Sequence, residues 1–290
     1  MNERENNRSA ILIYILAMAI WGSIGIFRRS IPLPSALLAG CRGITGALFL
    51  ILLLRLRKKP FLLPQRKLTG LLLIISGALI GLNWILLFEA YNYTSVPTAT
   101  LCYYMSPVIV ILASPFLFQE RITPRKGICA VMAVIGMVLV SGVLENVNAG
   151  TSQIKGISFG LGAALIYGSV VILNKKITGI DPYVKTIIQL LSSLFAVIPY
   201  IILTGQSTDV QITPQAVLLI LVLGIIHTGT AYAMYFHSME RLPAQTAAIL
   251  SYIDPITSLI LSALILNEHL SVYGIIGAVL IIVSALLSDI

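Results

Sequence analysis

Three side chains that can carry a charge lie deep inside long apolar stretches of this sequence: Arg42, His227 and Asp254. An ionisable side chain in the middle of a bilayer is costly, so it usually has a partner and marks a solute pathway or a coupling site. Asp254 is followed directly by Pro255, which lacks a backbone N–H and loosens the helical turn that precedes it. We therefore interpret Asp254 as a carboxylate that faces a polar cavity beside a helix break.

The three charged positions are expected at a similar depth. Asp254 lies about 11 residues from the cytoplasmic end of its stretch, and Arg42 and His227 lie about nine and about 12 residues from the outer ends of theirs, with a helical rise of about 1.5 Å per residue. In a hydrocarbon core about 30 Å thick, these positions fall near one level. An ion pair between Arg42 and Asp254 would offset much of the cost of burying either charge and could engage both ends of a zwitterion. The alternative for Arg42 is a structural role in packing and in capping backbone groups.

One histidine and several aromatic side chains extend this set. His227 and Asp254 are the candidates for proton coupling, because histidine titrates near neutral pH, although a lone histidine on a helix more often only hydrogen bonds to a neighbour. Aromatic rings with a polar tip can line a cavity and stack on flat or cationic solutes, whereas core packing is the alternative for any single ring. The rings that we expect to line a cavity for amino-acid-sized or aromatic solutes are Trp21, Trp84, Tyr104, Tyr167, Tyr232 and Tyr252.

The elements that must position these residues are apolar stretches of helix length. Of the 290 residues, 58% are hydrophobic and only 10% are charged, which excludes a water-soluble surface and predicts a membrane protein. A hydropathy window of about 19 residues predicts an all-α protein with ten transmembrane helices. The expected spans lie near 9–27, 33–54, 68–89, 96–118, 125–143, 154–174, 182–203, 215–237, 243–266 and 271–288.

The positive charge indicates how these spans are oriented. The net charge of +8 comes from short basic runs between apolar stretches, without the aromatic interleaving or zinc spacing of nucleic-acid readers, so we expect no nucleic-acid partner. If the N-terminus is cytoplasmic, the cytoplasmic segments hold 15 of the 19 Lys and Arg residues, the outer loops hold three, and Arg42 lies within a span. Because basic loops stay on the cytoplasmic side, we expect a multi-pass protein of the cell (cytoplasmic) membrane with both termini cytoplasmic.

The sequence also repeats itself. A shift of 148 residues aligns TATLCYYMSPVIVILASPFLFQERIT, from Thr98, with TAAILSYIDPITSLILSALILNEHLS, from Thr246, and a shift of 146 aligns IWGSIGIFRRSI with IYGSVVILNKKI. Each copy has five spans, an odd number, so the second copy must enter the membrane inverted. We predict two five-helix repeats, 1–148 with a cytoplasmic N-terminus and 149–290 inverted, around a central cavity. Ser106, the counterpart of Asp254, is expected to line the cavity, and Pro107, the counterpart of Pro255, marks a second helix break.

Several of these motifs resemble EamA-type members of the drug/metabolite transporter superfamily. They are the Trp21-Gly22 pair, weakened to Tyr167-Gly168 in the second copy, Arg42 in the second span, the prolines of spans four and nine, and the acidic ends FQERIT and LNEHLS. Such families usually have glycine before the final glutamate, where this sequence has Gln119 and Asn267. The resemblance covers essentially the whole length, and it implies a ten-helix carrier of small metabolites, often an exporter.

We therefore predict a secondary transporter that exports a small metabolite, such as an amino acid or an amphipathic compound, by alternating access, and not an enzyme. The expected partners are the small-molecule solute, the lipid bilayer and, if a proton gradient drives transport, protons, with the chain acting as a monomer or homodimer. No cofactor or metal site is predicted, and no phosphate-binding loop is present for ATP. Two alternatives are an intramembrane lipid-processing enzyme, which needs paired acidic motifs or a metal cluster, and a non-transporting scaffold or channel.

Overall fold

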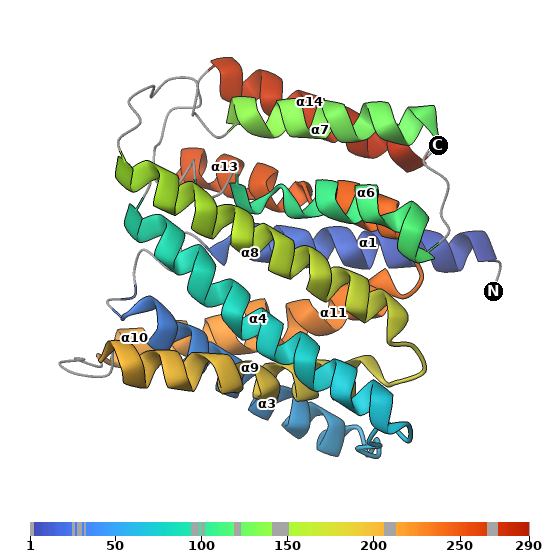
Figure 1. Ribbon diagram of the computed structural model, residues 1–290. Helices are drawn as coiled ribbons and strands as arrows, with labels where there is room; N and C mark the ends of the chain where they lie inside the picture. Colours follow the sequence, from blue (N-terminus) through green and yellow to red (C-terminus); the bar gives the residue numbers. More distant parts are fainter. Residues whose placement is uncertain are drawn as a thin grey trace.

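The computed structural model describes residues 3–24, 27, 31, 33–93, 99, 102–118, 123–140, 151–205, 213–265 and 272–289, and its regular secondary structure in these ranges is entirely helical (Figure 1). The helices are α1 (Glu3–Gly22), α3 (Ser35–Leu56), α4 (Lys67–Tyr93), α6 (Ser106–Phe118), α7 (Pro124–Val140), α8 (Thr151–Lys176), α9 (Pro182–Thr204), α10 (Pro214–Val222), the π-helix η2 (Leu223–Thr230), α11 (Ala231–Met239), α12 (Ala244–Leu250), α13 (Ile253–Ile265) and α14 (Val272–Asp289).

Each of the ten predicted spans coincides with one helix or with a run of adjoining helices. The eighth span is the continuous run α10, η2 and α11, and the ninth is α12 and α13 with a turn between them. Within the described part of the chain, five helical spans are long and apolar enough to cross a membrane by length and composition alone. These are 36–56, 67–87, 154–176, 182–204 and 214–239, and the remaining spans are shorter or interrupted helices. The prediction of an all-α membrane protein of ten spans is confirmed.

Corresponding helices of the two halves run in opposite directions (Figure 1). α1 starts beside the N-terminus and runs away from that end of the molecule, whereas its counterpart α8 runs toward it. The pairs α3 and α9, α4 and α10 to α11, α6 and α13, and α7 and α14 are opposed in the same way, and both termini lie at one end. The two five-helix repeats are therefore inverted, as predicted. The boundary predicted near residue 148 lies outside the described residues.

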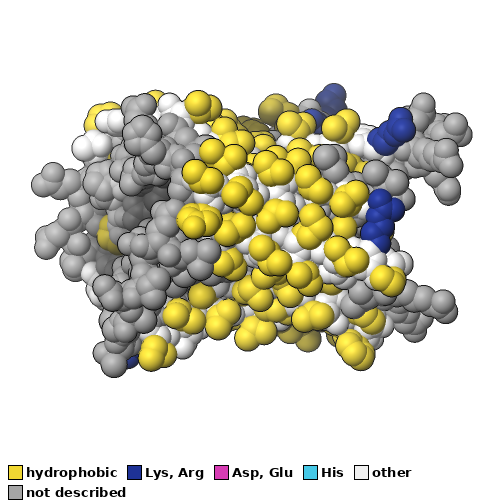
Figure 2. All heavy atoms as spheres, turned by 90° about the horizontal axis from the view of Figure 1, so that it is seen from above, with side chains coloured by type: hydrophobic (Ala, Val, Ile, Leu, Met, Phe, Trp, Pro, Cys, Tyr) yellow, Lys and Arg dark blue, Asp and Glu magenta, His cyan; other side chains and the backbone are white. Residues whose placement is uncertain are grey.

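The principal helix contacts join one repeat to the other. α4 packs against α8 and α9, α1 against α11 and α13, α3 against α9 and η2, and α7 against α14. The outer surface is apolar: Figure 2 shows a broad band of hydrophobic side chains, with the visible Lys and Arg side chains gathered mostly toward the end that carries the termini. This distribution is typical of a protein embedded in lipid, with the core shared between the repeats.

Small residues allow the closest of these contacts. A methyl group added to Gly77 of α4 would overlap the backbone carbonyl oxygen of Gln189 in α9, and one added to Gly81 would overlap that of Ser193. The Gly77-xxx-Gly81 spacing places both glycines on one face of α4, so the two backbones approach directly. This spacing is typical of close helix contacts in membrane proteins.

Lys185, one of the 15 basic residues counted in the cytoplasmic segments, is fully buried in the structure. It lies inside α9 and is 0% exposed. Its ammonium group donates hydrogen bonds to the carbonyl oxygens of Asn174 and Ile177, both at 2.9 Å, and forms an ion pair with Glu240 at 3.2 Å. Two carbonyls at the end of α8 and a carboxylate just after α11 thus compensate this buried charge, which ties three helices together at the end that carries the termini.

Replacing Gly77 by alanine should lower the thermal stability of the protein, because overpacking of a tight helix contact costs about 1–3 kcal/mol. The matched control is Gly70→Ala on the same helix, where an added methyl group would meet only the Pro64 ring, at 3.5 Å. Alanine favours the helix over glycine by about 1 kcal/mol, so the control should melt at the same temperature or slightly higher. The measurement is the monodisperse fraction of detergent-solubilised protein on heating, and equal melting of both variants would contradict the contact.

Candidate functional site

Arg42 lies at the centre of one group of the predicted site residues. Its side chain on α3 is 7% exposed, and the guanidinium carbon lies 4.5 Å from the centroid of the Trp84 ring on α4. The hydroxyl group of Tyr232 on α11 is its polar neighbour, and the Tyr232 ring packs edge-on against Trp84 with centroids 6.4 Å apart. The Nε atom of Arg42 is buried and has no hydrogen-bond partner. The guanidinium is thus held mainly by aromatic rings.

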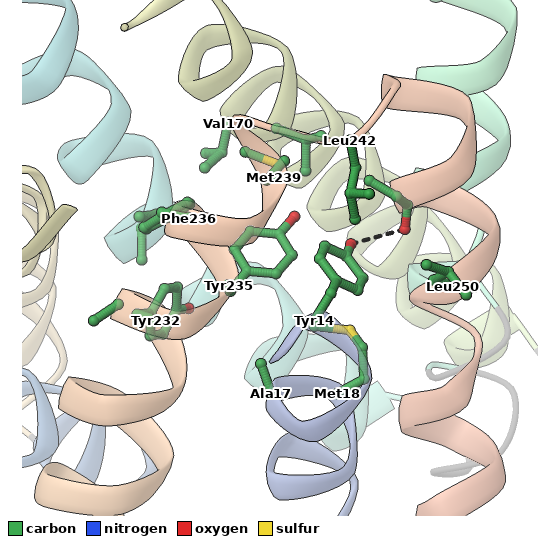
Figure 3. Packing of buried hydrophobic residues seen from close by; sticks show 14 of the residues in the cluster. Tyr14, Ala17, Met18, Val170, Tyr232, Tyr235, Phe236, Met239, Leu242 and Leu250 are labelled. Carbon is green, nitrogen blue, oxygen red and sulfur yellow. Dashed lines mark hydrogen bonds between the residues drawn. The ribbon is translucent and has the colours of Figure 1, made fainter. Parts of the chain in front are cut away.

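A continuous series of rings extends this group toward α1. Trp21 packs against Tyr232 and Tyr235 with centroid distances of 4.7 and 4.9 Å, and Tyr235 lies 5.1 Å from Tyr14. Figure 3 shows Tyr14 of α1 facing Tyr235 of α11, while the Tyr14 hydroxyl donates a 2.7 Å hydrogen bond to the backbone carbonyl of Ala247 in α12. Tyr14 and Tyr235 were not singled out from the sequence, because an aromatic residue on an apolar helix carries no signal of the face it occupies.

The second group of predicted residues surrounds Asp254. Tyr103 packs against Tyr104 and Tyr167 with centroid distances of 5.5 and 5.6 Å. The hydroxyl of Tyr252 donates a 3.2 Å hydrogen bond to the backbone carbonyl of Tyr104, whose own side chain is the polar neighbour of the Asp254 carboxyl group. Tyr104 and Tyr252 are counterparts in the two repeats, so the pseudo-two-fold axis passes close to this contact.

The helix break predicted at Pro255 lies a few residues earlier. The chain turns at Ser251 and Tyr252, where the Asp254 N–H bonds to the Ser251 carbonyl at 3.2 Å, and α13 begins at Ile253. Pro255 therefore sits in the first turn of α13, where a missing N–H leaves no helical hydrogen bond unmade. In the first repeat, a turn at residues 104–105 likewise precedes α6, which begins at Ser106 and Pro107, both buried.

A second interruption, in the eighth span, was not predicted from the sequence. Residues 223–230 form the π-helix η2, which contains His227. The hydroxyl groups of Thr228 and Thr230 each bond to the carbonyl five residues earlier, at 2.8 and 2.9 Å. π-Helical turns are uncommon and occur often at functional sites. The available signal was the run LGIIHTGT, which combines two glycines, two threonines and a histidine within an apolar helix.

The consecutive residues Trp21, Gly22 and Ser23 connect the two interruptions. The Trp21 indole N–H donates to the His227 carbonyl at 2.8 Å, and the Ser23 hydroxyl lies 2.8 Å from the His227 Nε2 atom. A methyl group added to Gly22 would overlap the backbone carbonyl oxygen of Asp254. The end of α1 thus lies against η2 on one side and against the start of α13 on the other.

The predicted ion pair between Arg42 and Asp254 is not formed, and this prediction was wrong. Neither hydrogen bonds nor ion pairs join the two side chains, both of which lie in the described part of the chain. α3, which carries Arg42, packs against α9 and η2, whereas α13, which carries Asp254, packs against α1. Figure 1 shows α1 and α11 between them. Arg42 and Asp254 were expected at the same depth in the membrane, but their helices are not neighbours.

The site thus combines one buried cation, one half-buried carboxylate and a series of aromatic rings with hydroxyl groups, drawn from both repeats. A guanidinium and a carboxylate can bind charged groups of a solute, and the rings can contact its apolar part. Among the described residues, no group of three His, Cys, Asp or Glu side chains is placed to hold a metal ion. This chemistry is suited to holding and orienting a small molecule.

Comparison with known proteins agrees with this arrangement. Residues 8–142 and 154–288 each match the EamA-like transporter family. The uncharacterized transporter YxxF of Bacillus subtilis (strain 168) is 27% identical over 273 residues, covering 94% of this chain and 87% of that protein. A protein of Escherichia coli (strain K12) described as a "probable amino-acid metabolite efflux pump" is 26% identical over 288 residues, covering 93% and 91% of the two chains.

The fold is also found among solved structures. One crystal structure superposes with a TM-score of 0.86 at 21% sequence identity, and the match covers 97% of this chain and 98% of that chain. It shows that the arrangement of helices recurs in another protein. Since the family match spans both repeats and so most of the sequence, the chain is a multi-pass membrane protein that belongs to the EamA-like transporter family.

Proposed function

We propose that the protein is a secondary transporter that exports a small metabolite, such as an amino acid or an amphipathic compound, by alternating access. The observation that carries this proposal is the convergence of charged and aromatic side chains from both inverted repeats around two helix interruptions. Carriers built from inverted repeats commonly bind their solute near the middle of the membrane, beside interrupted helices. The name of the Escherichia coli relative favours an amino-acid-related solute.

The interruptions offer a way for the helices to move. At the α12–α13 turn and in η2, the regular hydrogen-bond pattern is already broken, so a change of angle there costs fewer helical hydrogen bonds than elsewhere. The end of α1 contacts both places through Trp21, Gly22 and Ser23. A displacement of α1 would therefore move both interrupted spans together and open the site to one side of the membrane or the other.

We assign proton coupling to Asp254 in preference to His227. Both ring nitrogens of His227 have partners, since Nε2 lies 2.8 Å from the Ser23 hydroxyl and Nδ1 lies 3.4 Å from the Val222 carbonyl oxygen. The Asp254 carboxyl group has the Tyr104 side chain as its polar neighbour and is half-buried. A carboxyl group in this position can exchange a proton with the site as the protein changes conformation.

The direct test of transport is a comparison of metabolites secreted by cells that express the protein with those secreted by cells that do not. A solute that accumulates outside the expressing cells is then loaded into vesicles with the purified protein, and its flux is measured with and without a proton gradient. We expect faster flux than in empty vesicles, and a further increase when the gradient is imposed. Equal flux in both preparations for every accumulated solute would contradict the proposal.

Asp254→Asn should abolish gradient-driven transport, with at least a tenfold loss of flux, because asparagine cannot release or bind a proton. The protein should remain folded, since asparagine has nearly the same size as aspartate and its side-chain amide can still form hydrogen bonds. The matched control is Asp181→Asn, which makes the same chemical change at the half-buried N-cap of α9, where asparagine caps equally well and only an ion pair with the exposed Lys59 is lost. If the Asp254 variant transports with the pH dependence of the unaltered protein, another group carries the proton.

We also propose that both termini are cytoplasmic in the cell membrane. The test first replaces the native Cys41, Cys102 and Cys129. A single cysteine is then placed at Lys59, which lies beside the start of α9 at the end that carries the termini, or at Thr204, the last residue of α9. A membrane-impermeant maleimide should label the Thr204→Cys variant in intact spheroplasts, and the Lys59→Cys variant only after permeabilisation. The reverse pattern would place the termini outside.

A further inference from the structure

Arg42 is a buried cation whose Nε atom has no hydrogen-bond partner. Its side chain is 7% exposed, and no acidic side chain in the described part of the chain forms an ion pair with it. Lys185, the other buried basic side chain, shows how this protein compensates a permanent internal charge, with two backbone carbonyls and the Glu240 carboxylate. For Arg42 the described contacts are the Trp84 ring face and the Tyr232 hydroxyl group, and no carboxylate is among them.

The aromatic rings around Arg42 compensate it only in part. A guanidinium over the face of Trp84 gains a cation–π attraction, and the Tyr232 hydroxyl supplies one polar neighbour. A cation inside a membrane protein nevertheless remains destabilising unless an anion or several acceptors approach it. The Nε atom of the guanidinium group therefore still has an N–H to donate. A carboxylate can accept it together with an N–H of a terminal nitrogen, through two parallel hydrogen bonds.

We propose that Arg42 binds the carboxylate group of the transported solute, so that the solutes are organic carboxylates, amino acids among them. The carbon skeleton of the solute then lies against Trp84, Tyr232 and Trp21, the rings nearest to the guanidinium. This inference rests on the proposed transport function and adds the chemical class of the solute. It also makes the ion pair with Asp254 unnecessary, since the anion that compensates Arg42 arrives with the solute.

The two tryptophans of the chain, Trp21 and Trp84, both belong to this site, so tryptophan fluorescence reports on its occupancy. The parent protein for this assay is the full chain, purified in detergent with both tryptophans in place. The probes are leucine, isocaproate, which lacks the amino group, and isoamylamine, which lacks the carboxylate, together with phenylalanine, phenylpropionate and phenethylamine. We expect saturable changes with the carboxylates and none with the two amines.

Arg42→Gln in the same background should weaken the response to the carboxylates at least tenfold, and Arg42→Lys should restore part of it, because lysine keeps the charge but lacks the fork. The matched control is Arg57→Gln, which removes an arginine that packs over the Tyr183 ring, 5.5 Å from its centroid, at the exposed end of the same helix. Its response should equal that of the unaltered site.

Thermal stability separates a binding role from a structural one. If Arg42 is an uncompensated charge kept for binding, Arg42→Gln should melt at a higher temperature than the parent protein without solute, and leucine should raise only the melting temperature of the parent. A lower melting temperature with an unchanged response to leucine would assign Arg42 to the fold and overturn the proposal. Equal responses to amines and carboxylates, or no response to any carboxylate, would overturn it as well.

Failure of this inference can be told apart from failure of the transport function. If the exported solutes carry no carboxylate, transport stands and the assignment of Arg42 falls. If carboxylates bind and Arg42→Gln abolishes binding, but the vesicles show no flux above that of empty ones, the site stands and the transport function falls.

Discussion

An interrupted helix inside a membrane must find partners for its freed backbone groups within the protein, because the surrounding lipid offers none. Two of the interruptions in the described residues are η2 and the turn between α12 and α13. The end of α1 contacts both interruptions within three consecutive residues. The Trp21 indole and the Ser23 hydroxyl bond to His227 in η2, and Gly22, which has no side chain, lies directly against the start of α13. The Trp-Gly pair that recurs in weakened form in the second repeat thus has a physical explanation, since only a ring with an N–H donor followed by a residue without a side chain can make both contacts.

The two repeats share one core, although each is a complete five-helix unit in the sequence. Their principal contacts are exchanged, α1 with α11 and α13 of the other repeat, and α8 with α4 and α6. The exchanged junctions are unequal. A methyl group on Gly22 would overlap the Asp254 carbonyl oxygen, whereas one on its counterpart Gly168 would lie 3.6 Å from the carbonyl oxygen of Ser106, the counterpart of Asp254. One junction is tight and the other is looser, so the corresponding helices of the two repeats are not packed equivalently.

The sequence predicted the spans and the repeat well, because these depend on hydrophobic length and on alignment of the chain with itself. The role of the aromatic rings in a cavity stays a prediction. It did not predict lateral neighbours. Arg42 and Asp254 were expected to pair because they lie at one depth, but depth does not say which helices adjoin. Lys185 was counted with the cytoplasmic charges because a position near the end of an apolar stretch fits an exposed residue as well as a buried one. The π-helical stretch was not predicted because the hydroxyl groups of its threonines bond to main-chain carbonyls, which every residue has and which therefore leave no pattern in the sequence.

The two buried basic side chains show where the protein accepts a cost in stability. The Lys185 ammonium group binds the end of α8 and Glu240, just after α11. Its described acceptors are two backbone carbonyls and one carboxylate. Arg42 lies among rings on helices from both repeats, with its Nε atom unpartnered. A side chain that served only packing could have been replaced by an uncharged one of similar size, because such replacements of buried charges are often neutral or stabilising. A permanent cation at this place therefore fits the proposed contact between Arg42 and a carboxylate of the solute.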